Sequence, residues 1–216
     1  MKHRTSKTWL FDLDNTLYTP DSGLFDQIRA RIADYLVRRC GVDAANVMAT
    51  QQRYREEFGS TLAGLMAKKR IEPEPFLSFV HDVDYGVIDA NPTLARALAG
   101  LSGRRYIFTN GSTEHAQNVL GRLGIADLFD DVFDIVRAGY LPKPKQEPYD
   151  RIVRDFELVP QKTVFVEDMA CNLVPAKSRG MTTVLVAQDD GAATVEADYV
   201  IGDLAGWLSG SRLATS

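Results

Sequence analysis

The sequence predicts an α/β fold with a doubly wound parallel sheet, and three observations carry this prediction. Short apolar runs of strand length alternate with stretches of helical spacing, an order typical of parallel sheets. Polar residues follow directly after several of these runs. One long stretch near the N-terminus has helical spacing and no strand. Together they predict a Rossmann-like core with an α-helical cap inserted after the first strand.

Five apolar runs, several of them β-branched, have the length of buried strands. We expect strands at 8–13, 105–108, 131–136, 163–166 and 182–187. Asn91-Pro92 is typical of a helix start, because asparagine caps the free N–H groups and proline suits the first turn. We expect core helices at 91–98, 113–123, 148–156 and 171–179.

Residues 21–89 contain the helical stretch without strands. Leu24, Ile28 and Ile32 recur at helical spacing, and Asp43 is placed to cap a second helix that runs to Phe58. Two more helices are expected at 61–69 and 75–81. We therefore predict a core domain of residues 1–20 and 90–216 and an α-helical cap domain of residues 21–89.

Composition limits the classes of function. The 216 residues carry 25 basic and 29 acidic side chains, a net charge of −4, with no long basic block, which argues against binding to a nucleic acid polymer. No apolar run is long enough to span a membrane or to act as a signal peptide. Two distant cysteines, Cys40 and Cys171, favour a reducing cytoplasm over a disulfide framework. Monomer and homodimer both remain open.

The first chemical motif is Asp12-Leu13-Asp14-Asn15-Thr16 at the end of the first strand. Carboxylates two residues apart on a strand point to the same side and repel each other unless they share a cation or a proton. Ligands bind at the carboxyl ends of strands in open α/β sheets. Taken alone, the motif is more typical of an ordinary turn, because Asp and Asn are common there.

Three further motifs follow other strands in order. Thr109-Asn110-Gly111 precedes a helix and is suited to hold a phosphate. Lys143-Pro144 supplies a cation, and Glu167-Asp168 ends a buried strand with Asn172 one turn later. Each motif alone is weak, since a loop lysine or a helix-capping aspartate is common. Their shared position at strand ends indicates one site.

This order of motifs resembles the haloacid dehalogenase-like hydrolase superfamily from Trp9 to about Ala187. The opening Asp12-Leu13-Asp14-Asn15-Thr16-Leu17-Tyr18, the run from Tyr54 to Leu65 and the segment 82–85 are similar to its pyrimidine 5′-nucleotidase branch. The resemblance implies a phosphatase with a helical cap at the superfamily's first insertion point.

The resemblance also implies residue roles. Asp12 matches the nucleophile that forms an aspartyl-phosphate, and Asp14 the general acid/base. Mg²⁺ would be held by the Asp12 carboxylate, the Asp14 main-chain carbonyl and Asp168. Glu167 would add negative charge next to the metal, and Asn172, which replaces a frequent acid, would orient Asp168 or hold a metal-bound water.

The phosphate-binding residues implied by the resemblance are Thr109 and Lys143, with Asn110 and Gly111 as main-chain donors. Lys145 competes with Lys143 for the lysine role, and we favour Lys143 because it directly precedes Pro144.

Other candidates rest on weaker signals. Tyr18, Tyr54 and Phe58 are candidates for binding substrate, although the helical spacing of Tyr54 and Phe58 also fits a packed core. His115 lies early in the predicted helix 113–123, and we expect it on the surface.

We therefore predict a Mg²⁺-dependent phosphomonoesterase acting on a small phosphorylated metabolite, with pyrimidine nucleoside 5′-monophosphates as the expected substrates. The alternatives are a sugar phosphate or phosphoglycolate phosphatase, a phosphomutase and a non-catalytic binding protein. A dehalogenase is disfavoured, because the superfamily's dehalogenases lack the second aspartate, here Asp14, and use no metal.

Overall fold

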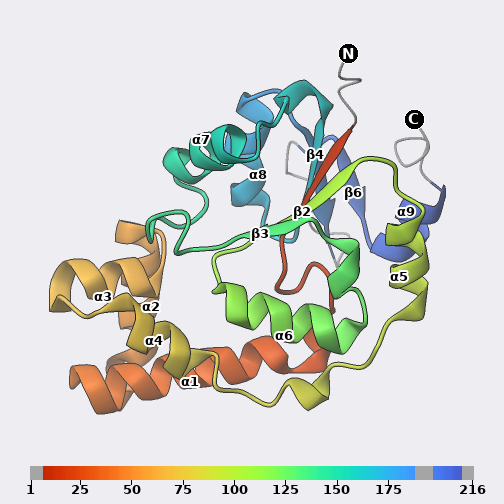
Figure 1. Ribbon diagram of the computed structural model, residues 1–216. Coiled ribbons are helices and arrows are strands. Elements are labelled where there is room, and N and C mark those ends of the chain that lie inside the picture. Colours follow the sequence, from red (N-terminus) through yellow and green to blue (C-terminus); the bar gives the residue numbers. More distant parts are fainter. Residues whose placement is uncertain (1–6, 188–196, 211–216) are drawn as a thin grey trace.

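The computed structural model describes residues 7–187 and 197–210. Its centre is a sheet of six strands in the order β3-β2-β1-β4-β5-β6, and every neighbouring pair is parallel (Figure 1). The strands are β1 Thr8–Phe11, β2 Arg104–Phe108, β3 Asp131–Phe133, β4 Thr163–Glu167, β5 Thr182–Val186 and β6 Tyr199–Ile201. The first five were predicted. Sequence patterns do not predict β6, because its three residues are not buried and form no apolar run of strand length.

Helices connect the strands. The α-helices are α1 Leu24–Cys40, α2 Val47–Phe58, α3 Thr61–Lys69, α4 Pro73–Val80, α5 Pro92–Ala99, α6 Thr113–Leu123, α7 Gln146–Asp155, α8 Ala170–Ser178 and α9 Leu204–Gly210. Short 3₁₀ turns lie at Pro20–Ser22, Ala44–Asn46, Tyr85–Val87, Ala126–Leu128 and Pro160–Lys162. The Asn91 side chain accepts a hydrogen bond from the main-chain nitrogen of Leu94, which confirms the predicted helix start. Chain ends often fray, so the sequence predicts a frayed segment at 209–216. This is wrong for Ser209 and Gly210, which belong to α9, while residues 211–216 lie outside the described residues.

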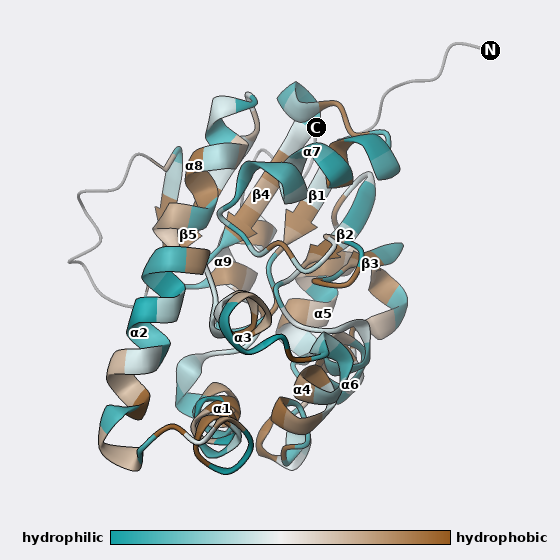
Figure 2. Ribbon diagram, turned by 90° about the vertical axis from the view of Figure 1, so that its left-hand side faces the viewer, coloured by the Kyte–Doolittle hydropathy of each residue, from teal (hydrophilic) through white to brown (hydrophobic). Residues whose placement is uncertain are grey.

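The central strands β1 and β4 are buried on both faces, as a sheet covered by helices requires. Trp9 and Phe11 of β1 belong to an apolar cluster shared with α5, α6 and α9. Leu10, which points to the opposite face, belongs to a cluster shared with α7 and α8. Figure 2 shows the hydrophobic colour of β1, β4 and β5. The expected doubly wound α/β fold is confirmed.

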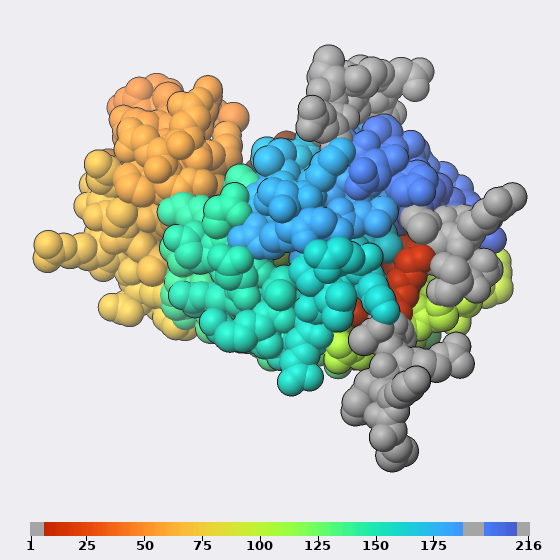
Figure 3. All heavy atoms as spheres, turned by 90° about the horizontal axis from the view of Figure 1, so that it is seen from above, coloured from red at the N-terminus to blue at the C-terminus, as the bar shows by residue number. Residues whose placement is uncertain are grey.

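Helices α1 to α4 form an insertion between β1 and β2, which we call the helical insertion (Figure 1). Most of its buried apolar residues form a third cluster around Leu36, Leu65 and Phe76, to which the rest of the chain adds the buried Ile135, whereas Leu24 belongs to the cluster of β1. Seen from above, the insertion projects at one side of the core (Figure 3). This is the place in the chain where the sequence predicted a cap.

Two connections join the helical insertion to the core. The outgoing connection includes Tyr18, and the returning connection runs through Tyr85. Arg122 of α6 holds the returning connection by donating to the main-chain oxygens of Tyr85, Gly86 and Ile88. The side-chain amide of Gln27 in α1 donates to the main-chain oxygen of Asp84 and accepts from its main-chain nitrogen.

No helix in the described part of the chain is both long and apolar enough to cross a membrane.

Candidate active site

The polar motifs converge at the carboxyl ends of β1, β2 and β4. Strand β1 lies between β2 and β4, and the chain builds the sheet outward from β1 in both directions. Such a reversal of strand order leaves a crevice at the strand ends, where open α/β sheets bind ligands.

Lys143 lies at the centre of a buried ionic cluster. Its Nζ is 2.7 Å from Oδ1 of Asp12, 2.7 Å from Oε2 of Glu167 and 2.7 Å from the main-chain oxygen of Phe108. The residue is only 2 % exposed, with its ammonium over the rings of Phe108 and Phe165. Burial alone would lower the pKa of Lys143, but the two carboxylates more than offset this and hold it above its ordinary value. Lys143 is therefore a charged amine fixed beside Asp12.

Asp12 follows β1 directly, and its main-chain nitrogen donates to Val166. Thr16 donates a 3.0 Å hydrogen bond to Oδ2, the oxygen that Lys143 does not contact. Burial and then the Glu167 carboxylate raise the pKa of Asp12 to about 7, against the lowering effect of Lys143. Sequence analysis did not single out Thr16, although it lies within the first motif. Both oxygens of Asp12 are held in place.

Asp14 has a separate set of partners. Its Oδ1 accepts a 2.6 Å hydrogen bond from the Tyr18 hydroxyl and lies 2.8 Å from Nε2 of His115. Burial would raise the pKa of Asp14, but the charge of His115 and the hydrogen bonds from His115 and Tyr18 lower it overall. The two carboxylates of the first motif thus lie in different electrostatic surroundings.

The expectation that His115 lies on the surface is wrong. His115 is fully buried, because it shares the inward face of α6 with Ala116, Val119 and Leu120. That apolar stripe is visible in the sequence and would have placed His115 on the buried side. Sequence analysis therefore missed a residue that contacts Asp14.

Thr109, Asn110 and Gly111 directly follow β2. The Thr109 hydroxyl accepts a 2.9 Å hydrogen bond from the main-chain nitrogen of Gly111, which leaves the hydroxyl proton available. A Cβ on Gly111 would lie 3.0 Å from Cδ2 of His115, so the chain passes close to the site. The Asn110 side chain bonds to the main-chain nitrogen and oxygen of Lys143. This side chain therefore positions the lysine loop.

Three carboxylates form a cluster suited to a divalent cation. Asp12, Glu167 and Asp168 each place an oxygen within 4.8 Å of the others. Burial raises the pKa of Glu167 to about 7, and it also raises that of Asp168. Lys143 supplies one positive charge to this cluster, so two negative charges remain when all three are ionised. Hard oxygen donors with excess negative charge are what Mg²⁺ prefers, so the residues fit this ion.

Two predicted neighbours of the metal have other contacts as well. Glu167, expected next to the metal, also holds Lys143 and accepts a hydrogen bond from the main-chain nitrogen of Met169. Asn172 is buried at the start of α8, and its main-chain oxygen accepts a 2.6 Å hydrogen bond from Tyr149. The expected contact between Asn172 and Asp168 stays a prediction.

The aromatic candidates for substrate binding lie in different places. Tyr54 is 4 % exposed inside the helical insertion, where Gly64 packs on its ring, so the ring is part of the apolar core there. Tyr18 is buried and bonds directly to Asp14. Phe58 is half-buried at the end of α2. A Cβ added at the next residue, Gly59, would lie 3.1 Å from Cγ of Pro142.

Lys145 does not join the ionic cluster around Lys143 among the described residues. It lies at the start of α7, and its Cε would be 3.7 Å from a Cβ on Gly59. Lys145 therefore lies between the core and the helical insertion, two residues beyond the lysine that contacts Asp12.

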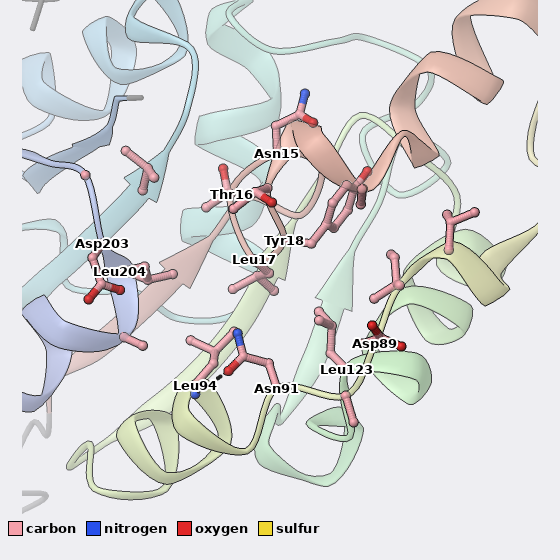
Figure 4. A pocket seen from close by; sticks show the side chains of 18 residues that line it. Asn15, Thr16, Leu17, Tyr18, Asp89, Asn91, Leu94, Leu123, Asp203 and Leu204 are labelled. Atoms are coloured by element: carbon pink, nitrogen blue, oxygen red, sulfur yellow. Dashed lines mark hydrogen bonds between the residues drawn. The ribbon is translucent and has the colours of Figure 1, made fainter. Parts of the chain in front are cut away.

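A cavity of about 410 Å³ lies beside the first motif (Figure 4). It is lined by Asn15 to Thr19, by Val87 to Asn91 and by residues at the start of α9, including Asp203 and Leu204. Asp12, Lys143 and Asp168 do not line it. Both connections of the helical insertion border this cavity, so they lie close together.

Comparison with known proteins defines the family. Residues 7–173 match the model of the haloacid dehalogenase-like hydrolases, and the chain belongs to this family. Phosphate metabolism protein 8 of Saccharomyces cerevisiae is 24% identical over 200 residues, 85% of this chain and 62% of the relative. Enolase-phosphatase E1 of Methylococcus capsulatus is 36% identical over 93 residues, 40% of this chain and 38% of the relative. The chain thus spans less than two thirds of the length of these curated relatives.

Solved structures share the fold. The L-2-haloacid dehalogenase of Xanthobacter autotrophicus matches with a TM-score of 0.60 at 19% identity, over 94% of this chain and 98% of that chain. The family therefore includes enzymes named as phosphatases and as dehalogenases, and the choice between these activities depends on the site.

Proposed function

We propose that the protein is a Mg²⁺-dependent phosphomonoesterase that acts through an aspartyl-phosphate and prefers pyrimidine nucleoside 5′-monophosphates. One observation carries the proposal. Asp12 belongs to the cluster of Lys143 and Asp168, whereas Asp14 is held separately by Tyr18 and His115. A nucleophile needs a neighbouring cation, and an acid/base needs a place of its own beside it.

The first chemical step transfers the phosphoryl group to Asp12. A carboxylate oxygen of Asp12 bonds to phosphorus while the bond from phosphorus to the ester oxygen breaks. The Asp14 carboxyl gives its proton to that oxygen, so a neutral alcohol leaves. Lys143 and the Thr109 hydroxyl bind the oxygens of the transferring group and lower the free energy of its charge.

The second step releases phosphate. Asp14, now a carboxylate, takes a proton from water as the water oxygen bonds to phosphorus. The bond between phosphorus and Asp12 breaks, and both carboxyl groups return to their starting states. A Mg²⁺ ion held by Asp12, Asp168 and the Asp14 carbonyl would reduce the repulsion between the nucleophile and the anionic phosphate.

We assign the pyrimidine preference to the helical insertion, which we propose acts as a cap over the leaving group. In this proposal residues 21–89 form the cap domain, and residues 1–20 and 90–216 form the core domain. The core motifs contact only phosphate and metal, which every substrate shares. Phe58 lies next to Gly59, which packs on Pro142, so this end of α2 contacts the loop that carries the phosphate-binding lysine. A half-buried aromatic ring is a suitable surface for a nucleobase.

A phosphate-release assay tests the proposal. The wild type is assayed with UMP, CMP, a hexose phosphate and phosphoglycolate, in Mg²⁺ and in excess EDTA, with Asp12→Asn as the control that removes the attacking oxygen. We expect release in Mg²⁺ alone, fastest with UMP or CMP, and none from Asp12→Asn. Equal rates on all four substrates would overturn the pyrimidine preference. Release in EDTA would refute the metal dependence, and halide release from a 2-haloacid in place of phosphate release would assign a dehalogenase.

A further inference from the structure

A chain of contacts joins the helical insertion to Asp14. His81, at the end of α4, stacks on His115 with 4.4 Å between ring centroids and 9° between ring planes. Tyr85, in the returning connection, places its hydroxyl 3.0 Å from Nδ1 of His115. Nε2 on the other side of the His115 ring is 2.8 Å from Oδ1 of Asp14. The ring of His115 therefore contacts the insertion and the carboxylate at the same time.

The outgoing connection reaches the same oxygen. Tyr18 donates its hydroxyl to Oδ1 of Asp14 at 2.6 Å. Among the residues at 7–187 and 197–210, the hydrogen bonds to the Asp14 side chain both fall on Oδ1. Oδ2 is thereby left for proton exchange. Both connections of the insertion thus act on one carboxylate oxygen, Tyr18 directly and Tyr85 through His115.

The surroundings of His115 leave its ring no alternative orientation. The ring is fully buried, with Gly111 close to Cδ2 on one side and His81 stacked on its face. His81 is itself held, because its Nδ1 lies 3.0 Å from the hydroxyl of Ser112 at the start of α6. The ring can therefore transmit a displacement of the insertion to Asp14.

The hydroxyl of Tyr85 has several partners. It donates to the main-chain oxygen of His81 at 2.9 Å, lies 3.0 Å from Nδ1 of His115, and also has a hydrogen bond with the side chain of Asn118. Because the Tyr85 proton goes to the main-chain oxygen of His81, the Tyr85 oxygen can accept from Nδ1 of His115. Loss of the Tyr85 hydroxyl would remove the partner of Nδ1, so the hydrogen bonding of the ring would be reduced to its contact with Asp14 at Nε2.

We propose that His115 is a positioning residue that fixes the Asp14 carboxyl for proton transfer, and that Tyr85 and Tyr18 make this orientation depend on the position of the helical insertion. The inference rests on the proposed function and deepens it, since the known motifs account for Asp14 itself but not for what holds it.

The test compares two substrates that differ in their need for an acid. p-Nitrophenolate leaves without much help from a proton, whereas phenolate from phenyl phosphate needs one. The value of kcat/KM reports the steps up to departure of this group, before water attacks. The variants are His115→Ala, His115→Gln, which keeps a donor at the position of Nε2, and Tyr85→Phe. Tyr106→Phe, which changes a buried tyrosine on β2 outside the described site, is the matched control.

We expect His115→Ala and Tyr85→Phe to lower kcat/KM for phenyl phosphate by about 10- to 100-fold, the usual effect of removing a residue that orients an active-site ligand. The loss for p-nitrophenyl phosphate is expected to be several-fold smaller, with His115→Gln restoring most of the activity on phenyl phosphate. Tyr106→Phe should leave the ratio of the two rates unchanged.

The outcomes separate this inference from the proposed function. Equal losses on both substrates, or no loss in Tyr85→Phe, would overturn the positioning role while phosphatase activity stands. A wild type that releases phosphate from neither substrate would refute the proposed function itself. If His115→Ala does not fold, Tyr85→Phe and His115→Gln decide, because they keep the volume of the buried side chains.

Discussion

Replacing Gly111 by alanine tests how tightly the site is packed. The new methyl would lie 3.0 Å from Cδ2 of His115, 3.3 Å from Oγ1 of Thr109 and 3.8 Å from Oδ2 of Asp14. A Cβ added at Gly121, which lies in α6, would meet no neighbouring residue within 4 Å. The same substitution at Gly121 is therefore a matched control in open space.

Whether Gly111→Ala raises or lowers the free energy of unfolding depends on whether the neighbours of the new methyl can move. The main chain at Gly111 is held at both ends, since its nitrogen donates to Thr109 and its oxygen accepts from Ile135. His115 cannot withdraw, because His81 stacks on its other face. A methyl group forced into a well-packed site lowers the free energy of unfolding by about 1–3 kcal/mol. For a chain of this length that lowers Tm by roughly 2–4 °C for each kcal/mol.

Urea unfolding and a thermal melt of both variants measure the effect. We expect Gly111→Ala to lower the free energy of unfolding and to reduce kcat/KM for phosphate release, because the methyl presses on His115 beside Asp14. Gly121→Ala should raise the free energy of unfolding by roughly 0.5–1 kcal/mol, as alanine favours a helix over glycine. A stable and fully active Gly111→Ala protein would refute the close packing of the site.

Three further predictions concern the ionic groups. Lys143→Met should lower kcat/KM by about 10²-fold or more, the scale of one lost electrostatic donor, whereas Lys145→Met should have a small effect. The reverse order of the two variants in steady-state assays would mean that the wrong lysine is assigned to the phosphate. Asp168→Ala should abolish the rise in Tm that Mg²⁺ gives the wild type, as calorimetry will show, and an unchanged rise would exclude it as a ligand. Burial and the charge of His115 lower the pKa of His81 to about 3, below its value in the unfolded chain. The unfolded state thus binds more protons between these values, so stability should fall as pH drops below about 6.5, by about 2 kcal/mol at pH 5. Urea titrations of His81→Gln should lack this loss, and an equal loss in both proteins would contradict it.

The core motifs could be predicted because three of the four lie at the end of an apolar run, and Lys143 lies in the loop after another. Lys143 illustrates the reason: its partners Asp12 and Glu167 are remote in sequence, but each directly follows or ends a strand that the sequence shows. Since neighbouring parallel strands end at one edge of the sheet, the ends of the apolar runs at β1 and β4 already imply that Asp12 and Glu167 lie close together.

Contacts made through the helical insertion could not be predicted in this way. His81 and Tyr85 meet His115 because of how the insertion sits on α6, and no periodicity in one segment reports its position against another. Tyr54 shows the limit within a single helix, since helical spacing fits a core and a ligand surface equally until packing against Gly64 is known.

The separate apolar cluster of the helical insertion has a consequence for how the protein loses activity. Apart from Leu24, which joins the cluster of β1, the insertion packs around its own buried side chains with Ile135 from the core, while β1, β2 and β4 are stabilised by two other clusters. Regions with separate cores open with separate free energies. In mild denaturant we expect the amides of α1 to α4 to exchange with solvent while those of the central strands stay protected. Such an opening would pull Tyr18 and Tyr85 from their contacts near Asp14, so inactivation would precede the unfolding of the sheet.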